Sequence, residues 1–313
     1  MNQLRDQPIT HAYRPGVGEV GPQRSRRRRV IVARLRNAAR ALVSGVVAAA
    51  SLLAPFQELP TVAGFSAISE LTGFDTCAAP SSATMDNWWL NSTYSNIGIY
   101  IGGGNRACSQ PNLTSSWISH QNATGWGLLP IWVGRQMPYQ SCSNNNWPGG
   151  QITLNTTTAY NEGYSEAQAA LSAASALGMD TNNMPLIYDL EGYNGGTTCR
   201  NVAKYFLKGW AAYLAIAPAQ KSGVYGSSCS SYLSDFASNG QPPDFIWGAN
   251  WDLNPSTSTL ACVPSGYWVN HQRHKQYKGP HNETHGSYTI YIDNDCSNGP
   301  VYYQLNTYGS TCL

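Results

Sequence analysis

The sequence predicts a single α/β domain folded as a (β/α)8 TIM-like barrel that is irregular in its second half. Short apolar or β-branched runs recur at fairly even intervals, and helical patterns separate some of them. Strands joined by helical crossovers form parallel sheets, and eight strands in the 250 residues from 64 to 313 fit a closed barrel. The expected strands are residues 71–74, 96–101, 128–133, 186–190, 223–225, 245–248, 267–270 and 289–292.

Two segments between these runs predict amphipathic helices, because their apolar residues recur every three or four positions. The first segment has this spacing at Ala167, Ala170, Leu171, Ala174 and Leu177. The second has it at Val202, Tyr205, Phe206, Gly209, Trp210, Tyr213 and Leu214. Residues 252–266 and 271–287 show no helical period, so we expect irregular connections in the second half.

The N-terminal segment has the pattern of an export signal. Ten of the 19 Lys and Arg residues precede residue 41, and an apolar stretch follows at residues 41–54. That stretch suits a signal peptide, and Ser25-Arg26-Arg27 loosely matches a twin-arginine signal. We therefore predict a leader at residues 1–63, a mature barrel at 64–313 without a membrane span, and a secreted or cell-envelope location. The alternative is an uncleaved membrane anchor.

The charge balance of the mature segment argues against nucleic acid as a partner. From residue 64 onward there are nine Lys and Arg residues against 14 Asp and Glu residues, which is a net charge of −5. A nucleic-acid-binding domain needs a basic surface instead. No sequence motif indicates a cofactor. The sequence does not specify an oligomeric state.

The eight cysteines predict disulfides. All of them lie after the leader, their number is even, and no C-x-x-C pair occurs. Most follow an expected strand closely, which places them in loops on one face of the barrel. Pairing of neighbouring loops would give 77–108, 142–199, 229–262 and 296–312, although 105 arrangements are formally open.

The strongest catalytic candidates are Asp189 and Glu191, in the segment Ile-Tyr-Asp-Leu-Glu. They end an apolar strand, and side chains two positions apart on a strand point to the same side. Glycoside hydrolysis needs a proton donor and a second carboxyl group, and two close carboxyl groups separate their pKa values. A solvated pair or a helix cap is the structural alternative, which the position at the end of a barrel strand disfavours.

Further acidic residues are expected around the same opening. Asp75 ends the first strand, and Asp293 and Asp295 end the last one. The first and last strands are neighbours in a closed barrel, so these carboxyl groups should face the pair on the fourth strand. Asp293-Asn294-Asp295 could instead form a turn or half of a calcium loop, but the Gly and the distal Glu of an EF-hand are missing.

Aromatic and polar residues at the expected strand ends predict a site for a neutral, polar ligand such as a sugar, because aromatic faces pack against sugar rings. The mature chain is rich in Trp and Tyr, and charged residues make up only 12% of the whole sequence. No metal site is expected, because the histidines after residue 270 lie beside Gly and Pro rather than on a helix. No Gly-x-Ser-x-Gly motif supports a serine hydrolase. The substrate-binding candidates are Tyr100, Trp132, Tyr225, Trp247, Asn250, Trp251, His271, Gln272 and Asp295.

An ordered series of motifs resembles a known family. Gly73-Phe74-Asp75, the segment at Asp189, and Ile292-Asp293 occur in the order seen in domain-of-unknown-function family 1906, a glycoside-hydrolase-like barrel of secreted actinobacterial proteins. The series is more distantly similar to the family 25 muramidases. That resemblance implies peptidoglycan or a related glycan as substrate, Glu191 as general acid and Asp189 as its partner. It also implies that Asp75 and Asp293 are supporting carboxyl groups.

The sequence thus favours an extracellular glycosidase that acts on cell-wall or other polysaccharide. Two alternatives stay open at this point. One is a glycan-binding or envelope protein without catalysis on the same barrel, and the other is a structural exported protein whose carboxyl groups hold the barrel rim. The sequence does not specify the sugar or the linkage.

Overall fold

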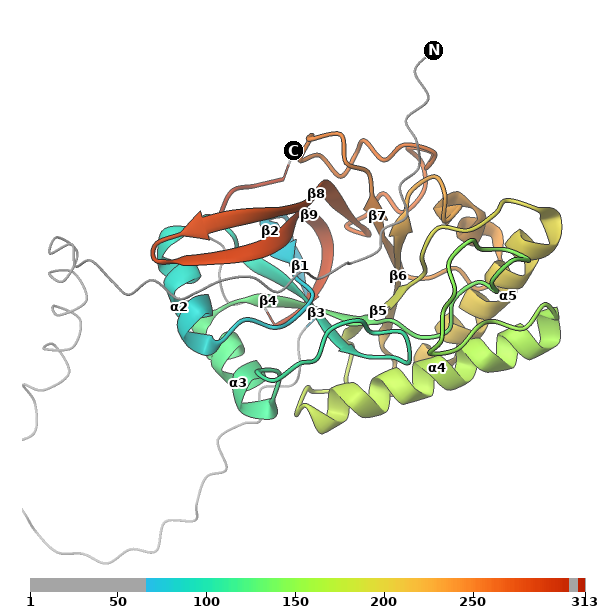
Figure 1. Cartoon of the computed structure of the whole chain (residues 1–313), viewed down its shortest axis with the longest axis horizontal. Helices are drawn as coiled ribbons and strands as arrows, with labels where there is room; N and C mark the ends of the chain where they lie inside the picture. The colour runs from blue at the N-terminus through green and yellow to red at the C-terminus, as the bar shows by residue number, and fades with distance from the viewer. Residues whose placement is uncertain (1–65, 304–308, 313) are drawn as a thin grey trace, which may run out of the picture. The chain divides into compact units, whose positions relative to one another are not determined.

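The computed structural model describes residues 66–303 and 309–312, and these form a closed barrel (Figure 1). Strands β2 to β8 run parallel, and β9 closes the ring by pairing antiparallel with both β8 and β2. A short strand, β1, pairs with β9 outside the ring. The strands are β1 (Ser66–Ser69), β2 (Thr72–Asp75), β3 (Asn96–Gly102), β4 (Gly127–Trp132), β5 (Pro185–Asp189), β6 (Lys221–Ser227), β7 (Phe245–Ala249), β8 (Arg273–His285) and β9 (Tyr288–Tyr302).

The helices cover the outside of the first half of the barrel. They are α2 (Ser82–Asn91), α3 (Ser115–Thr124), α4 (Thr156–Ala176), α5 (Thr197–Leu214) and the 3-10 helix η1 (Leu233–Ser238). Helices α4 and α5 lie side by side (Figure 1) and approach closely at two glycines. A Cβ atom on Gly163 would lie 1.9 Å from the backbone oxygen of Phe206, so only glycine fits there. Both predicted helical segments are confirmed.

The barrel fold is confirmed, with an irregular second half as expected. Apolar side chains from alternate strand positions fill the interior, among them Leu129, Ile131, Ile187 and Trp247. A larger apolar layer lies between the strands and the helices. The connection from β7 to β8 contains no helix, and β8 and β9 form a long hairpin.

The expected strand at residues 267–270 is wrong. This segment is a loop in which Trp268 has a φ of 50°, which interrupts an extended backbone. Trp268 is buried, and its Nε1 donates a hydrogen bond to the backbone oxygen of Pro243. Trp268 therefore fills the core beneath a loop, whereas its neighbours Tyr267 and Val269 are exposed. The strand at this place in the barrel is β8, which begins with Arg273.

The direction of the last strand also differs from the expectation. The predicted run at 289–292 lies within β9, but β9 is antiparallel to its neighbours rather than parallel. The reason is the connection, because the turn between His285 and Tyr288 has no room for a helical crossover. Asp75 on β2 is nevertheless paired in register with Asp293 on β9.

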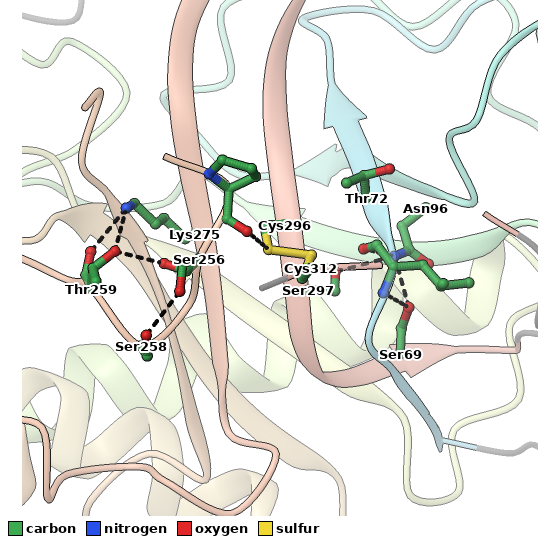
Figure 2. The surroundings of a disulfide bond; sticks show 12 residues. Ser69, Thr72, Asn96, Ser256, Ser258, Thr259, Lys275, Cys296, Ser297 and Cys312 are labelled. Atoms are coloured by element: carbon green, nitrogen blue, oxygen red, sulfur yellow. Dashed lines mark hydrogen bonds between the residues drawn. A yellow bond between two sulfur atoms is a disulfide. The ribbon is translucent and has the colours of Figure 1, made fainter. Parts of the chain in front are cut away.

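All four predicted disulfides are confirmed: Cys77–Cys108, Cys142–Cys199, Cys229–Cys262 and Cys296–Cys312. Figure 2 shows the last of these, which ties β9 to the C-terminal segment. Beside it, the amide of Asn96 donates hydrogen bonds to Ser69 and Ser297. This buried side chain therefore joins β3 to β1 and β9.

The predicted leader at residues 1–63 lies outside the described residues. Among residues 66–303 and 309–312, no helix is both long enough and apolar enough to span a bilayer.

Replacing Cys142 and Cys199 together by alanine should lower the free energy of unfolding by about 4 kcal/mol, because this bridge closes a loop of 57 residues. The same change at Cys296 and Cys312, which are 16 residues apart, should cost about 3 kcal/mol. Equilibrium unfolding in urea measures both losses. A larger loss for the shorter loop would contradict this ranking.

Candidate active site

Asp189 and Glu191 lie at the carboxyl end of β5, the end of the barrel where (β/α)8 enzymes build their sites. One buried side chain, that of Gln136, fixes this segment. Its Nε2 donates to the backbone oxygen of Asp189 over 2.6 Å, and its Oε1 accepts from the backbone N–H of Glu191 over 2.9 Å. The backbone N–H of Leu190 donates to the backbone oxygen of Tyr225 on β6 over 2.9 Å. The two carboxyl groups therefore stand on a rigid backbone.

Both carboxyl groups line a cavity of about 210 Å³. Its other walls come from the loops after β2, β3 and β4, and they include Tyr100, Arg106 and Trp147. Asp189 and Glu191 are nevertheless largely buried, with 3% and 9% of their surfaces exposed. The pair thus stands at the base of an opening rather than on an outer surface.

Asp75, at the end of β2, lies at the centre of a hydrogen-bond network in the barrel mouth. Its Oδ2 accepts a hydrogen bond of 2.7 Å from Nε2 of Gln276, and its Oδ1 accepts one of 3.4 Å from the hydroxyl of Tyr100. Oε1 of Gln276 in turn accepts from the Tyr225 hydroxyl and from the Trp251 indole. These neutral donors hold the Asp75 carboxyl group in one orientation.

Asp293 and Asp295 complete a cluster of five carboxyl groups with Asp75, Asp189 and Glu191. The antiparallel pairing sets Asp293 opposite Asp75, and Asp295 opposite Gln276. All five are buried, and Asp189, Glu191, Asp293 and Asp295 form no ion pair with Lys or Arg in the described part of the chain. Strands far apart in the sequence therefore bring acidic groups together in the barrel mouth.

Burial is the main cause of raised pKa values across this cluster. It raises the pKa of Glu191 to about 8 and, together with the charge of Asp75, the pKa of Asp293 to about 9. The pKa of Asp189 is raised well above its usual range by burial first, then by Glu191 and Asp75. Burial, Asp75 and Asp293 raise the pKa of Asp295 in the same way. The cluster therefore holds several protons at neutral pH.

Among the predicted aromatic residues, three lie at the mouth of the barrel. Tyr100 and Tyr225 are buried there and take part in the network around Asp75. Trp251 is 43% exposed, and its indole packs over Gly279 on β8. An exposed ring joined by hydrogen bonds to an acidic site is suited to stacking on a sugar.

Three other residues that were predicted to contact the ligand contact other parts of the protein instead. Trp247 is fully buried and packs against Tyr225, so its ring has no exposed face. Trp132 donates its indole N–H to Glu166 on α4, outside the barrel. The side chain of Asn250 accepts a hydrogen bond from the backbone N–H of Ala261 and thereby stabilises the loop between β7 and β8. The position of these residues at strand ends did not show whether their side chains contact the protein or a ligand.

The prediction that His271 and Gln272 face the substrate is wrong. They precede β8 and therefore lie at the opposite end of the barrel from Asp189. Gln272 donates to the backbone oxygen of Asp244, just before β7, and His271 contacts Asn298. The error follows from the misplaced strand, because the end of a strand at 270 would have put them at the mouth.

Sequence reasoning missed Gln136, Gln276 and Arg106. None belongs to a motif, and the contacts of Gln136 and Gln276 are with residues that are distant in sequence. Gln276 lies in the polar run Arg-His-Lys-Gln, which does not look like a barrel strand. A buried glutamine is recognisable as functional only when its partners are known.

Within residues 66–303 and 309–312, no group of three or more His, Cys, Asp or Glu side chains is arranged to hold a metal ion. The histidines after residue 270 have other contacts. His281 and His285 both bond the carboxyl group of Glu283, which also accepts from Tyr94 and thereby fastens the hairpin to the end of α2.

A closed barrel with carboxyl groups at the ends of its strands defines the class of glycoside-hydrolase-like barrels. Comparison with protein families agrees with this class, since the model of the Rv2525c-like, glycoside hydrolase-like domain matches residues 86–297. The chain belongs to this family, and the resemblance noted in the sequence is confirmed. No curated protein sequence matches the chain.

Solved structures with a similar fold share little sequence with it. The Tat-secreted protein Rv2525c of Mycobacterium tuberculosis, in complex with HEPES, is 16% identical with a TM-score of 0.46, and the match covers 75% of this chain and 99% of that chain. A family 25 glycosyl hydrolase from Bacillus anthracis is 15% identical, with a TM-score of 0.45 and coverage of 77% and 94%. The Clostridium perfringens spore cortex lytic enzyme SleM is 12% identical, with a TM-score of 0.46 and coverage of 73% and 68%.

Gln136→Met should lower the free energy of unfolding by about 2–4 kcal/mol, because two buried backbone groups lose their partners. Urea denaturation measures the loss. Gln121→Met is the matched control, since Gln121 is equally buried and its amide has no hydrogen-bond partner among the described residues. Equal effects of the two substitutions would show that the contacts of Gln136 contribute nothing.

Stability should fall as the pH rises from about 4.5 to about 9. Glu191 and Asp293 have raised pKa values in the folded state, so in this window the folded protein binds more protons than the unfolded chain. Their contribution is complete below the unfolded pKa values and is lost as the pH passes the folded values. Thermal unfolding across this range measures the trend, and Asp293→Asn should flatten it. A melting temperature that rises over the same range would contradict the assignment.

Proposed function

We propose that this protein is an exported glycoside hydrolase that acts on cell-wall or other polysaccharide, with Glu191 as general acid and Asp189 as its partner. The observation that carries the proposal is that Glu191 lines a cavity beside a second carboxyl group, where burial raises its pKa to about 8. A general acid must hold its proton at the working pH, and the raised pKa of Glu191 meets that requirement.

In this mechanism Glu191 donates its proton to the glycosidic oxygen as the bond to the anomeric carbon breaks. Water then adds to that carbon and gives up a proton to a carboxylate of the pair. Asp189 lies beside Glu191 and titrates together with it, so the pair keeps a proton available at neutral pH. The positive charge that develops on the sugar needs a negative group nearby. Asp75 is the candidate for this group, since Gln276 and Tyr100 donate hydrogen bonds to its carboxyl oxygens.

Export is supported by the four disulfides, since such bonds persist in oxidising compartments outside the cytosol. The basic and apolar pattern of residues 1–63 supports the same inference from the sequence.

Glycan binding without catalysis is the second candidate. The observation that favours it is the depth of the carboxyl groups, since only 1% of Asp75 and 3% of Asp189 are exposed. On this scaffold the aromatic mouth would hold a sugar while the carboxyl groups shape the base of the site. Such a protein binds wall polysaccharide and releases no new reducing ends.

The test is a reducing-end assay on purified peptidoglycan and on common plant and fungal polysaccharides. Glu191→Gln should lower the rate about 10²–10⁴-fold, because the proton donor is lost. For the unchanged protein, the rate should fall as the pH rises above about 8, where Glu191 loses its proton.

Asp86→Asn is the control, since Asp86 is an exposed carboxyl group on α2 that pairs with His120. It should leave the rate unchanged. Full activity of Glu191→Gln would refute the assignment of the general acid, whereas glycan binding with no reducing ends from any substrate would favour the second candidate.

A further inference from the structure

The cavity beside Asp189 and Glu191 has a cationic side chain in its wall. Arg106 lines the same 210 Å³ space, together with Tyr100 and Trp147. It is the one Lys or Arg among the described residues that line this cavity. A positive group, two aromatic rings and two carboxyl groups thus surround one small space.

The loop that carries Arg106 is held from several sides. The Cys77–Cys108 disulfide ties it to the loop after β2. The side chain of Asn105 donates to the backbone oxygens of Gly134 and Gly150 over 2.8 and 3.0 Å. It also accepts from the N–H of Gly149 over 2.8 Å. The backbone at Arg106 is therefore fixed relative to the cavity.

The guanidinium of Arg106 has no acidic partner among residues 66–303 and 309–312. Its one side-chain hydrogen bond is a long contact of 3.4 Å to the backbone oxygen of Tyr100. By contrast, Arg135 and Arg200 form ion pairs with carboxyl groups of the neighbouring helices. An arginine has five N–H donors, so most of those on Arg106 remain available to a ligand.

Arg106 also stands apart from the two carboxyl groups that share its cavity. Burial alone raises the pKa of Glu191, and the causes for Asp189 are burial, Glu191 and Asp75. A guanidinium in contact with either group would lower its pKa instead. Arg106 therefore makes no ion pair with either carboxyl group in the described part of the chain, although all three line the same cavity.

We infer that Arg106 binds a carboxylate carried by the sugar in this cavity, so that the protein prefers acidic glycans over neutral ones. A planar guanidinium matches a carboxylate through two parallel hydrogen bonds. The cavity is smaller than the roughly 300–1,000 Å³ typical of drug-sized ligands, which suits one sugar ring. A single positive group also balances a single negative charge, whereas a doubly charged phosphate would leave excess negative charge beside Asp189 and Glu191.

This inference rests on the proposed function, because it assumes that the cavity holds a sugar. Two kinds of glycan carry the required group: a ring carboxylate in a hexuronic acid, or the lactyl ether carboxylate of N-acetylmuramic acid. Both present a carboxylate on a ring whose other groups are neutral. The two sources are separated by the choice of probe.

The experiment measures binding by calorimetry at pH 6 in the Glu191→Gln background, which prevents cleavage. The acidic probes are a tetrasaccharide of alternating N-acetylglucosamine and N-acetylmuramic acid without peptide, and tetragalacturonic acid. Each is compared with its methyl ester, and chitotetraose is the neutral reference. At least one acid should bind about tenfold more tightly than its ester, which corresponds to about 1.4 kcal/mol.

Arg106→Gln should reduce that ratio to about one and leave the affinity for the ester unchanged. Lys221→Gln is the charge-matched control, because Lys221 begins β6 at the opposite end of the barrel, and it should keep the ratio. Preference for the muramic or the galacturonic probe identifies the source of the carboxylate, and either result supports the inference.

The inference would be overturned if the protein with Arg106 in place bound an acidic probe and its methyl ester equally tightly. It would also be overturned if Arg106→Gln weakened the binding of acid and ester by the same factor. If chitotetraose and the esters still bind in that case, the proposed sugar site stands and only the role of Arg106 fails. If no probe binds and no polysaccharide yields reducing ends, the proposed function fails and this inference fails with it.

Discussion

Closure of the barrel by an antiparallel strand is the constraint on which the site depends. Strand β9 lies between β8 and β2, and its register sets Asp293 opposite Asp75 and Asp295 opposite Gln276. Gln276 and Asp75 are 201 residues apart in sequence and form a hydrogen bond of 2.7 Å. If β9 were shifted by one residue, its inward side chains would point outward and the carboxyl cluster would separate. The chemistry of the mouth therefore follows from strand pairing.

Burying five carboxyl groups together has an electrostatic consequence. Burial raises the pKa values of Asp189, Glu191, Asp293 and Asp295, so the cluster lowers its charge by holding protons. Lys275 on β8 does not change this, since it is fully buried and bonds Asp252 and Thr259. Figure 2 shows its contact with Thr259. A general acid must hold its proton at the working pH, and the raised pKa values of these carboxyl groups meet that requirement. The same raised pKa values link the stability of the fold to pH.

The sequence predicted those parts of the site that lie on apolar strands. Asp189 and Glu191 follow a run of buried residues, so their position at a strand end was evident from the pattern. Pairing of neighbouring loops was sufficient to predict the four disulfides. Strand β8 was misplaced because its first residues are charged or polar although they are buried. Arg273 is surrounded by backbone oxygens, among them those of Tyr267 and Pro264, and no sequence pattern shows these partners.

The sequence by itself thus determined the barrel, its helices α4 and α5, its disulfide pairs and the identity of the acidic residues, because apolar periodicity and strand ends are local properties of the chain. Tertiary structure decided which polar groups meet. It set Gln136 behind the carboxyl pair, Gln276 on Asp75 and Arg106 in the cavity wall, and it removed His271 to the other end of the barrel. Such contacts join residues from separate strands and loops, so they are fixed only when the barrel closes and each buried polar group finds its partner.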